Sequence, residues 1–478
     1  MRAMSSAVAW LACAAAGAAG WPQLQHDPQH TGYTTERLDA PKGFQVGWRT
    51  DFLSFDPPEH VYRTVQVVSA EGKLFIPTQE GSLFALDPAT GKAVWRFHCG
   101  EGVLHTAGYE DGRVFFATIA GSVHAVSAAD GKPIWRWSNG RRTGFSSAVC
   151  LAEGKVFVTG RGGDVHAFSQ ADGKELWAFD VPAPVYQTAA YNDGHIYFAA
   201  ENMHCYCLAA ADGKQVWKSR KLGGMSFRDY CPLVHRKRVI LESQPAFGEK
   251  WVDTFPLVGW PPKKKLDPWL AKHSAELRQG KLSPETLQEI IAAQDLRTAL
   301  LEKAPEERLF TVLDEKTGED AFILPFFRQT MNGAQPPPAV DRDGMLVAPL
   351  HFVTAGWGRI DLGRQRYVDL LVDANDQFGP SSPGRGNPDE CMNLSVAGNW
   401  VFAIHWQEGN AQYTGAFNLD TRKWTHLPCA VRDWFTDFVG RGDGVAHNAQ
   451  CGNNAASIAN GNVYHQAFHV VHTWIPRK

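Results

Sequence analysis

The chain has almost no excess of one charge and, beyond its first twenty residues, no long apolar run. Its 47 Lys and Arg residues nearly balance its 50 Asp and Glu residues, which gives a formal net charge of −3 and a sequence pI near 6.7. A surface charged so evenly is not expected to bind nucleic acid or anionic membranes in general. No apolar segment after residue 20 approaches the roughly 18 residues that a transmembrane helix needs.

The first twenty residues have the features of a secretory signal peptide. Arg2 is followed by an apolar stretch through Ala19, and small residues precede Trp21. This pattern predicts a leader at 1–20 and export to the periplasm or cell envelope. The segment Leu11-Ala12-Cys13 loosely resembles a lipid-attachment site, so a lipid anchor at Cys13 is an alternative.

Cysteine is sparse, with nine residues in all. Eight of them follow the leader, and an even number in an exported protein permits disulfides. Their spacing does not assign pairs, and Cys150 and Cys205 fall where strand residues belong, so buried free thiols are an equal alternative. The eight are Cys99, Cys150, Cys205, Cys207, Cys231, Cys391, Cys429 and Cys451.

A repeated phrase that ends in tryptophan organises the chain. It reads GSLFALDPATGKAVW at 81–95, GSVHAVSAADGKPIW at 121–135, GDVHAFSQADGKELW at 163–177 and MHCYCLAAADGKQVW at 203–217. The four tryptophans are therefore separated by 40, 42 and 40 residues. A period near 40, with short strand-like segments and no helical pattern inside it, predicts the four-stranded antiparallel blades of an all-β propeller. Because one blade cannot cover so large a side chain, we expect each tryptophan to pack against the next blade.

Eight blades can be followed, although seven remains an alternative because the sixth and eighth are weakly marked. The last copy offers only three strands, and Phe44 to Arg49 resembles the outer strand at 93–96, so we expect it to close the ring. Phe417 to Trp424 keeps the repeat and recovers its tryptophan. The predicted blades are 65–97, 104–137, 145–179, 186–219, 230–325 with an insertion, 338–370, 391–426, and 455–474 plus 44–50.

The chain is thus divided into a leader at 1–20, an N-terminal extension at 21–43 and a propeller at 44–478. An insertion at 243–305 interrupts the fifth blade. Asp267-Pro268 and Ser283-Pro284 are typical helix starts, and Leu287, Ile290, Ile291, Gln294 and Leu301 would share one helix face. A small α-helical hairpin is predicted, either as a decoration on its own blade or as a lid or partner-docking element.

Residues that precede each inner strand differ from blade to blade, whereas the outer strands repeat. Positions that differ around the ring are where a specific site can be built at the channel mouth, although they could instead only line a water-filled channel. Asp229 is the first candidate for an acid there. The candidate ligand-binding residues are Arg63, His105, Gln187, Arg228, Asp229, Asn332, Asn393 and Asn453.

No metal site is predicted. The spacing His465-x3-His469-x2-His472 would suit a helix, but the surrounding valines and Tyr464 favour strands. On a strand, His465 and His469 would share a face and His472 would not.

The pattern Ala-Asp-Gly-Lys-x-x-Trp, as at 129–135, resembles the tryptophan-docking repeat of PQQ-like, quinoprotein-type propellers. The opening segment WPQLQHDPQHTG at 21–32 is similar to the start of exported bacterial members. The family contains dehydrogenases that use pyrroloquinoline quinone with calcium. It also contains the BamB-like propeller of outer-membrane assembly, which is a scaffold without a cofactor.

Two features of the quinoprotein alcohol dehydrogenases are missing from the chain. It has no adjacent cysteine pair, the nearest being Cys205-Tyr206-Cys207, and no Cys-x-x-Cys-His haem attachment sequence. The sequence therefore favours an exported, monomeric, non-catalytic scaffold without a cofactor, which binds a protein or small ligand at the channel mouth. The alternative is a dehydrogenase that oxidises an alcohol or sugar with PQQ and calcium.

Overall fold

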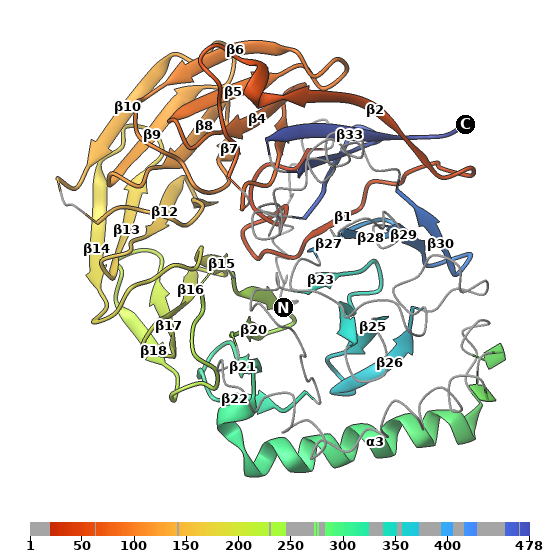
Figure 1. The fold of residues 1–478 in the computed structure, drawn as a ribbon. Coiled ribbons are helices and arrows are strands. Elements are labelled where there is room, and N and C mark those ends of the chain that lie inside the picture. Colours follow the sequence, from red (N-terminus) through yellow and green to blue (C-terminus); the bar gives the residue numbers. More distant parts are fainter. Residues whose placement is uncertain are drawn as a thin grey trace, which may run out of the picture.

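A closed ring of eight β-sheets surrounds a central axis (Figure 1). Each sheet has four antiparallel strands, and one has a fifth strand added in parallel. The predicted all-β, eight-bladed propeller is therefore confirmed, and the seven-blade alternative is wrong. The computed structural model describes residues 20–62, 64–140, 143–228, 231–244, 272–273, 275–276, 283–324, 338–350, 356–371, 393–404, 415–427, 455–467 and 469–478.

The first four blades follow one another without interruption. Each runs from a three-residue inner strand to an outer strand whose residues are largely exposed or half-buried. They are β3 (Val68–Ala70), β4 (Lys73–Pro77), β5 (Ser82–Leu86) and β6 (Ala93–His98); β7 (Gly108–Glu110), β8 (Arg113–Ala117), β9 (Ser122–Ser127) and β10 (Pro133–Ser138); β11 (Cys150–Ala152), β12 (Lys155–Thr159), β13 (Asp164–Ser169) and β14 (Glu175–Asp180); and β15 (Ala190–Asn192), β16 (His195–Ala200), β17 (His204–Ala209) and β18 (Gln215–Lys218).

The other four blades are less regular in sequence but have the same strand order. Short 3-10 helices lie at η1 (Phe52–Ser54) and η3 (Pro305–Glu307). The strands are β19 (Leu233–His235), β20 (Arg238–Glu242), β21 (Phe310–Asp314) and β22 (Asp320–Phe322); β23 (Ala339–Val340), β24 (Leu346–Leu350), β25 (Gly356–Asp361) and β26 (Arg366–Leu370); β27 (Asn393–Ala397), β28 (Trp400–Ile404), β29 (Gly415–Asn418) and β30 (Lys423–His426), with β1 (Tyr33–Thr34) added; and β31 (Ser457–Ala459), β32 (Asn462–Ala467), β33 (Val470–Pro476) and β2 (Phe44–Asp51).

Strand β2 closes the ring as predicted. It pairs antiparallel with β33, from Phe44 opposite Pro476 to Asp51 opposite Val470. The N-terminal strand thus supplies the outer strand of the eighth blade and covers an edge that β33 would otherwise expose.

The predicted packing of each repeated tryptophan on the next blade is also confirmed. The Trp135 indole lies over Gly173, where an added Cβ would come within 2.6 Å of the ring. Its Nε1 donates a hydrogen bond to the Gln170 carbonyl at 2.9 Å. Trp48, Trp95, Trp177 and Trp217 repeat both contacts, on Gly91, Gly131, Gly213 and Gly318.

Trp424 does not join this girdle, so the prediction that its copy repeats the pattern is only partly right. In blades 1 to 4 a β-bulge in the outer hairpin places the tryptophan opposite a small or apolar residue, as Trp95 lies opposite Ala85. The shorter turn of blade 7 has no bulge, and Trp424 lies opposite Phe417. A one-residue slip turns a side chain to the other face, and Trp424 Nε1 donates to Leu371 of the preceding blade at 3.3 Å.

The histidine assignment in blade 8 is corrected by the hairpin between β32 and β33. His465 lies directly opposite His472, so these two share a face, whereas His469 precedes the first residue of β33. The sequence prediction treated residues 465–472 as one strand. The chain instead reverses after Ala467, which changes the face on which His472 lies.

Helix α3 (Pro284–Lys303) lies between β20 and β21, and so within the insertion of blade 5. The helix begins at the predicted start, but the predicted partner helix falls mostly outside the described residues. Thr286, Gln294 and Leu301 are buried along one face. The Gln294 amide forms two hydrogen bonds with the Tyr367 backbone, at 3.2 and 2.8 Å. The helix therefore contacts the outer edge of β26 in blade 6 (Figure 1). Its last turn is joined to β22 of blade 5 through Arg308, which bonds to the Leu301 carbonyl and to Asp320.

Replacing Gln294 by Met is expected to lower the free energy of unfolding by about 1–3 kcal/mol. The substitution keeps the length of the side chain but leaves the Tyr367 N–H and C=O without their partner. Gln288→Met, at an exposed position of the same helix, is the matched control. Urea unfolding should separate the two variants, and equal midpoints would contradict this docking contact.

Candidate functional site in the central channel

Residues 21–36, here called the strap, run around the inside of the ring and contact all eight blades in order. The strap forms a backbone pair with Ser69 of β3 at its start and the parallel strand β1 on β27 near its end. Each of the other blades bonds to the next part of the strap, through its inner strand or, in blade 8, through the turn after that strand. The bonds are Tyr109 N to Pro22 O (2.7 Å), Leu151 N to Gln23 Oε1 (3.0 Å), Tyr191 N to Pro28 O (2.7 Å), Val234 N to Gln29 O (2.9 Å), Val340 N to Thr31 O (2.8 Å), Val396 N to Gly32 O (2.8 Å) and Asn460 N to Glu36 Oε2 (3.1 Å).

Two local features let the strap follow this curved path. Gln25, His26, His30 and Gly32 have positive φ angles, which turn the chain sharply. The Asp27 carboxylate accepts hydrogen bonds from the Thr31 backbone N–H, at 2.9 Å, and from its hydroxyl. These bonds close the loop from Asp27 to Thr31 and fix the course of the segment.

The strap fills one end of the channel. Its contacts lie near the ends of the inner strands, close to the hairpins that lead to the second strands. Trp21 and His30 are fully buried, and Leu24 packs with Ala148 and Cys231. Residues of the predicted N-terminal extension are therefore part of the core of the propeller, at the end where the inner strands lead into their hairpins.

Two imidazoles lie in the channel, one from the strap and one from the predicted site. His30 Nδ1 lies 2.9 Å from the Pro232 carbonyl, which fixes the proton on that nitrogen. His30 Nε2 has no hydrogen-bond partner among the described residues. His105 Nδ1 accepts the Thr106 N–H at 2.9 Å, so its proton is on Nε2. Burial lowers the pKa of His30 to about 4, and burial together with His30 lowers the pKa of His105 to about 3. Both rings are neutral near pH 7.

Gln187 and Arg228 are the other predicted site residues whose side chains the structure describes. Gln187 is fully buried, and its Oε1 accepts the Ala199 N–H of β16 at 2.7 Å. The Gln187 Oε1 atom therefore accepts a hydrogen bond from its own blade, blade 4. Arg228 is exposed, and its guanidinium lies over the Tyr186 ring, 4.9 Å from the centroid.

The remaining predicted site residues stay predictions. Asn393 is the first residue of β27 and lies opposite Ile404, but its side chain is outside the description. Arg63, Asp229, Asn332 and Asn453 also lie outside the described residues. The structure therefore shows that the described candidates come from blades 2, 4 and 7 and from the connection to blade 5, without showing one assembled site.

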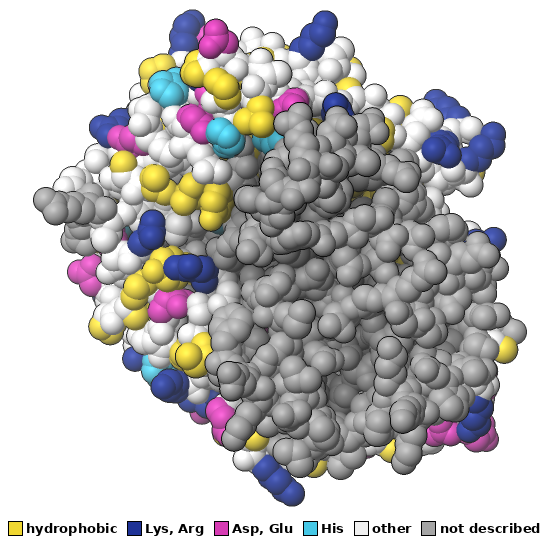
Figure 2. Space-filling view, in the orientation of Figure 1, with side chains coloured by type: hydrophobic (Ala, Val, Ile, Leu, Met, Phe, Trp, Pro, Cys, Tyr) yellow, Lys and Arg dark blue, Asp and Glu magenta, His cyan; other side chains and the backbone are white. Residues whose placement is uncertain are grey.

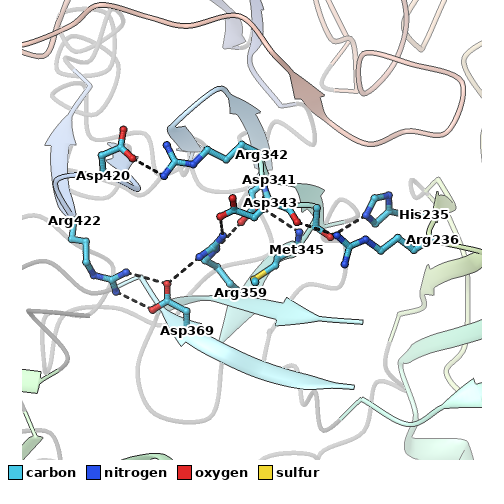
Figure 3. Close-up of polar contacts among 11 residues, drawn as sticks. His235, Arg236, Asp341, Arg342, Asp343, Met345, Arg359, Asp369, Asp420 and Arg422 are labelled. Carbon is cyan, nitrogen blue, oxygen red and sulfur yellow. Dashed lines mark hydrogen bonds and ion pairs between the residues drawn. The ribbon is translucent and has the colours of Figure 1, made fainter. Parts of the chain in front are cut away.

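A network of charged residues joins blades 6 and 7 at the strap end of the ring (Figure 3). Arg359 of β25 contacts three carboxylates: Asp341 at 2.6 Å, Asp343, and Asp369 at 3.5 Å. Asp369 also forms two 3.0 Å bonds with Arg422 of blade 7. Burial would lower the pKa of Arg359, but these carboxylates raise it above its ordinary value.

Neighbouring contacts extend the network to blade 5 and further into blade 7. His235 Nε2 and Arg236 bond to the carbonyls of Gly344 and Asp343, both at 3.0 Å. Arg342 pairs with Asp420 of blade 7 at 2.5 Å. Sequence reasoning missed the strap. It also missed this network, because the charged residues of the network belong to three different copies of the repeat.

Arg359→Met is expected to lower the free energy of unfolding by about 3–5 kcal/mol. The change removes the cationic partner of the fully buried Asp341 carboxylate, which keeps only the backbone N–H groups of Asp343 and Met345. Arg364→Met, which removes a side chain that is 74% exposed and 3.5 Å from Asp361, should cost less than about 1 kcal/mol. Similar chemical-denaturation midpoints for the two variants would show that the network adds no stability.

Other features of the described chain bear on the sequence predictions. Five of the cysteines are free thiols, which favours free thiols over disulfides for these five: Cys99, Cys150, Cys205, Cys207 and Cys231. None of the described helices combines the length and hydropathy needed to cross a bilayer. On the part of Figure 2 that is coloured by residue type, basic and acidic side chains are interspersed, as the balanced composition predicts.

Comparison with known proteins shows what these features resemble. A family model described as outer membrane protein assembly factor BamB matches residues 34–140 and 119–246. No curated protein sequence is significantly similar to the chain.

Solved structures share the fold at low sequence identity. BamB from Moraxella catarrhalis is 11% identical, with a TM-score of 0.53 over 90% of this chain and 99% of that one. A quinohemoprotein alcohol dehydrogenase from Pseudomonas putida HK5 is 12% identical, with a TM-score of 0.55 over 96% and 80%. A europium-containing methanol dehydrogenase is 11% identical, with a TM-score of 0.54 over 96% and 98%. In its repeats, its eight blades and this family match over residues 34–246, the chain is similar to the PQQ-like β-propellers.

Proposed function

We propose that the chain is an exported, non-catalytic propeller that binds a protein segment or another ligand at the channel mouth where the inner strands begin. The strap carries this proposal, because it occupies the other end of the channel with the chain's own backbone and buried side chains. The family model, described as an outer membrane assembly factor, is consistent with a protein-binding scaffold. The signal peptide predicted at residues 1–20 supports export. A lipid anchor at Cys13 is the alternative way in which the exported chain would be held.

The chemistry of the described mouth residues suits a peptide or another ligand rich in acceptors. The Arg228 guanidinium is exposed and lies over Tyr186, and guanidinium N–H groups donate well to carbonyl or carboxylate oxygens. The protonated Nε2 of neutral His105 is a second donor. The proposal further includes a monomeric chain and a helical hairpin, of which α3 is the second helix.

Site-specific photo-crosslinking in the native envelope tests which face binds. A photoreactive residue at Arg228 should capture a discrete partner, whereas one at Lys132, an exposed turn residue at the strap end of blade 2, should not. The full-length exported chain is used in both cases. Equal crosslinking from both positions, or turnover of an alcohol or sugar without any crosslink, would overturn the proposal.

The second candidate function is a calcium- and PQQ-dependent dehydrogenase, favoured by the shared fold with the alcohol dehydrogenase. PQQ is anionic and would need cations and hydrogen-bond donors, and calcium would need oxygen ligands. The described candidates offer Arg228 as a cation, whereas Gln187 Oε1 is already bonded within blade 4. Asp229, the candidate acid, lies outside the described residues, and we derive no catalytic step.

Titration of the purified chain with PQQ and Ca²⁺ separates the two functions. The scaffold proposal expects no change in the quinone spectrum and no increase in the thermal midpoint. Stabilisation that requires both ligands together would support the dehydrogenase, because a ligand that binds the native state raises its stability.

A further inference from the structure

Two buried histidines face each other on the last hairpin of the chain. His465 of β32 lies directly opposite His472 of β33, so both side chains project from the same face of blade 8. Their ring centroids are 5.4 Å apart and their planes are inclined by 76°. His465 is 8% exposed and His472 is 2% exposed.

The hydrogen-bonding capacity of these rings is not used. Both nitrogens of His472 and Nδ1 of His465 are buried and have no hydrogen-bond partner among the described residues. Buried polar atoms in native proteins are almost always paired with protein, water or an ion. Three unpaired ring nitrogens in one cross-strand pair therefore point to a group that these residues bind.

The charge state of the rings suits metal binding. Burial lowers the pKa of His472 to about 3, and burial together with His472 lowers the pKa of His465 well below its usual value. Both imidazoles are neutral near pH 7. The neutral ring, with a lone pair available, is the form that ligates metal ions.

The spacing of the rings also suits a shared ion. With bonds of about 2.0–2.1 Å from nitrogen to Zn²⁺ and a tetrahedral angle between them, two imidazole centroids lie about 5.2 Å apart. The observed separation is 5.4 Å. Trp474 stacks on His465 and meets His472 edge to face, with centroids at 5.7 and 4.5 Å, which fixes the orientation of both rings.

We propose that His465 and His472 form a two-histidine site for a divalent transition-metal ion of the Zn²⁺, Cu²⁺ or Ni²⁺ class. No group of three or more potential ligands occurs in the described part of the chain, so water or an exogenous donor completes the coordination. Arg49, the cross-strand neighbour of His472 on β2, has an exposed side chain. Imidazole is a preferred ligand of these ions, whereas Ca²⁺ and Mg²⁺ prefer oxygen. The proposal is independent of the proposed function.

The test uses the full chain, stripped of metal with EDTA and titrated with Cu²⁺ and Zn²⁺. The wild type should bind one more equivalent than His465→Phe or His472→Phe, or bind at least tenfold more tightly. Its Cu²⁺ EPR spectrum should show coupling to two nitrogens. His195→Phe, at a partly exposed histidine of β16, is the matched control and should behave as the wild type.

The phenylalanine variants keep an aromatic ring against Trp474, so they separate metal binding from packing. Zn²⁺ should raise the thermal midpoint of the wild type and the control but not of either variant. If all four chains bind the same number of ions with equal affinity, or the wild type binds none, the pair serves only as aromatic packing and the proposal is wrong.

Discussion

Gly173→Ala is expected to lower the free energy of unfolding by about 3–5 kcal/mol, whereas Gly154→Ala should cost only about 1–2 kcal/mol. Both glycines have left-handed backbone, with φ of +71° and +68°, so both substitutions introduce similar backbone strain. They differ in surroundings. A Cβ at Gly173 would lie 2.6 Å from the Trp135 ring, whereas a Cβ at Gly154 meets nothing within 4 Å.

The difference between the two variants therefore measures the docking of a tryptophan on its neighbouring blade. Displacing Trp135 also breaks its 2.9 Å hydrogen bond to Gln170. Urea unfolding followed by tryptophan fluorescence gives both free energies. Equal losses in the two variants would mean that backbone strain, and not the girdle, explains the cost.

Removal of the strap is expected to have the second large effect. A chain that begins at Arg37 should be less stable than one that begins at Trp21 by an amount on the order of 5–10 kcal/mol. The truncated chain loses the hydrogen bonds that the strap forms with the eight blades, each contributing roughly 0.5–1.5 kcal/mol. It also loses the burial of Trp21 and Leu24.

Hydrogen exchange locates this effect within the molecule. The amides of Tyr109, Tyr191 and Val234 donate to strap carbonyls, so they should exchange much faster in the truncated chain. The amide of Phe116, in strand β8 between its neighbours β7 and β9, is the internal control. Adding a synthetic peptide of residues 21–36 should restore protection. Unchanged exchange at the three inner-strand amides would contradict the role given to the strap.

The repeat explains why so much of the fold could be predicted. Each copy carries its own turn residues, strand pattern and tryptophan, so local sequence specifies one blade and the copy number specifies the ring. The closing strand β2 was identified for the same reason, because Phe44 to Arg49 resembles an outer strand. Prediction is less accurate where a copy is altered. In blade 7 the shorter turn moves Trp424 to the face opposite to that of the girdle tryptophans. In blade 8 the hairpin between β32 and β33 brings His472 opposite His465.

The candidate site was less predictable because its residues come from different blades. Nothing in the sequence around His105 indicates His30, which reaches the channel only because the strap circles the inner strands. Likewise, Arg359, Asp369 and Arg422 become neighbours only when blades 6 and 7 pack together.

The sequence by itself determined the blade and the strand that closes the ring, because these depend on local turn chemistry and on periodicity, and it left eight or seven blades as the alternatives that the structure resolved to eight. Only the tertiary structure decided that residues 21–36 fill one end of the channel, that α3 contacts blade 6, and that two histidines meet on the last hairpin. The first two features depend on contacts between segments far apart in the chain, whose spacing in sequence carries no information about their distance in space. The histidine pair depends on the position at which the last hairpin reverses the chain.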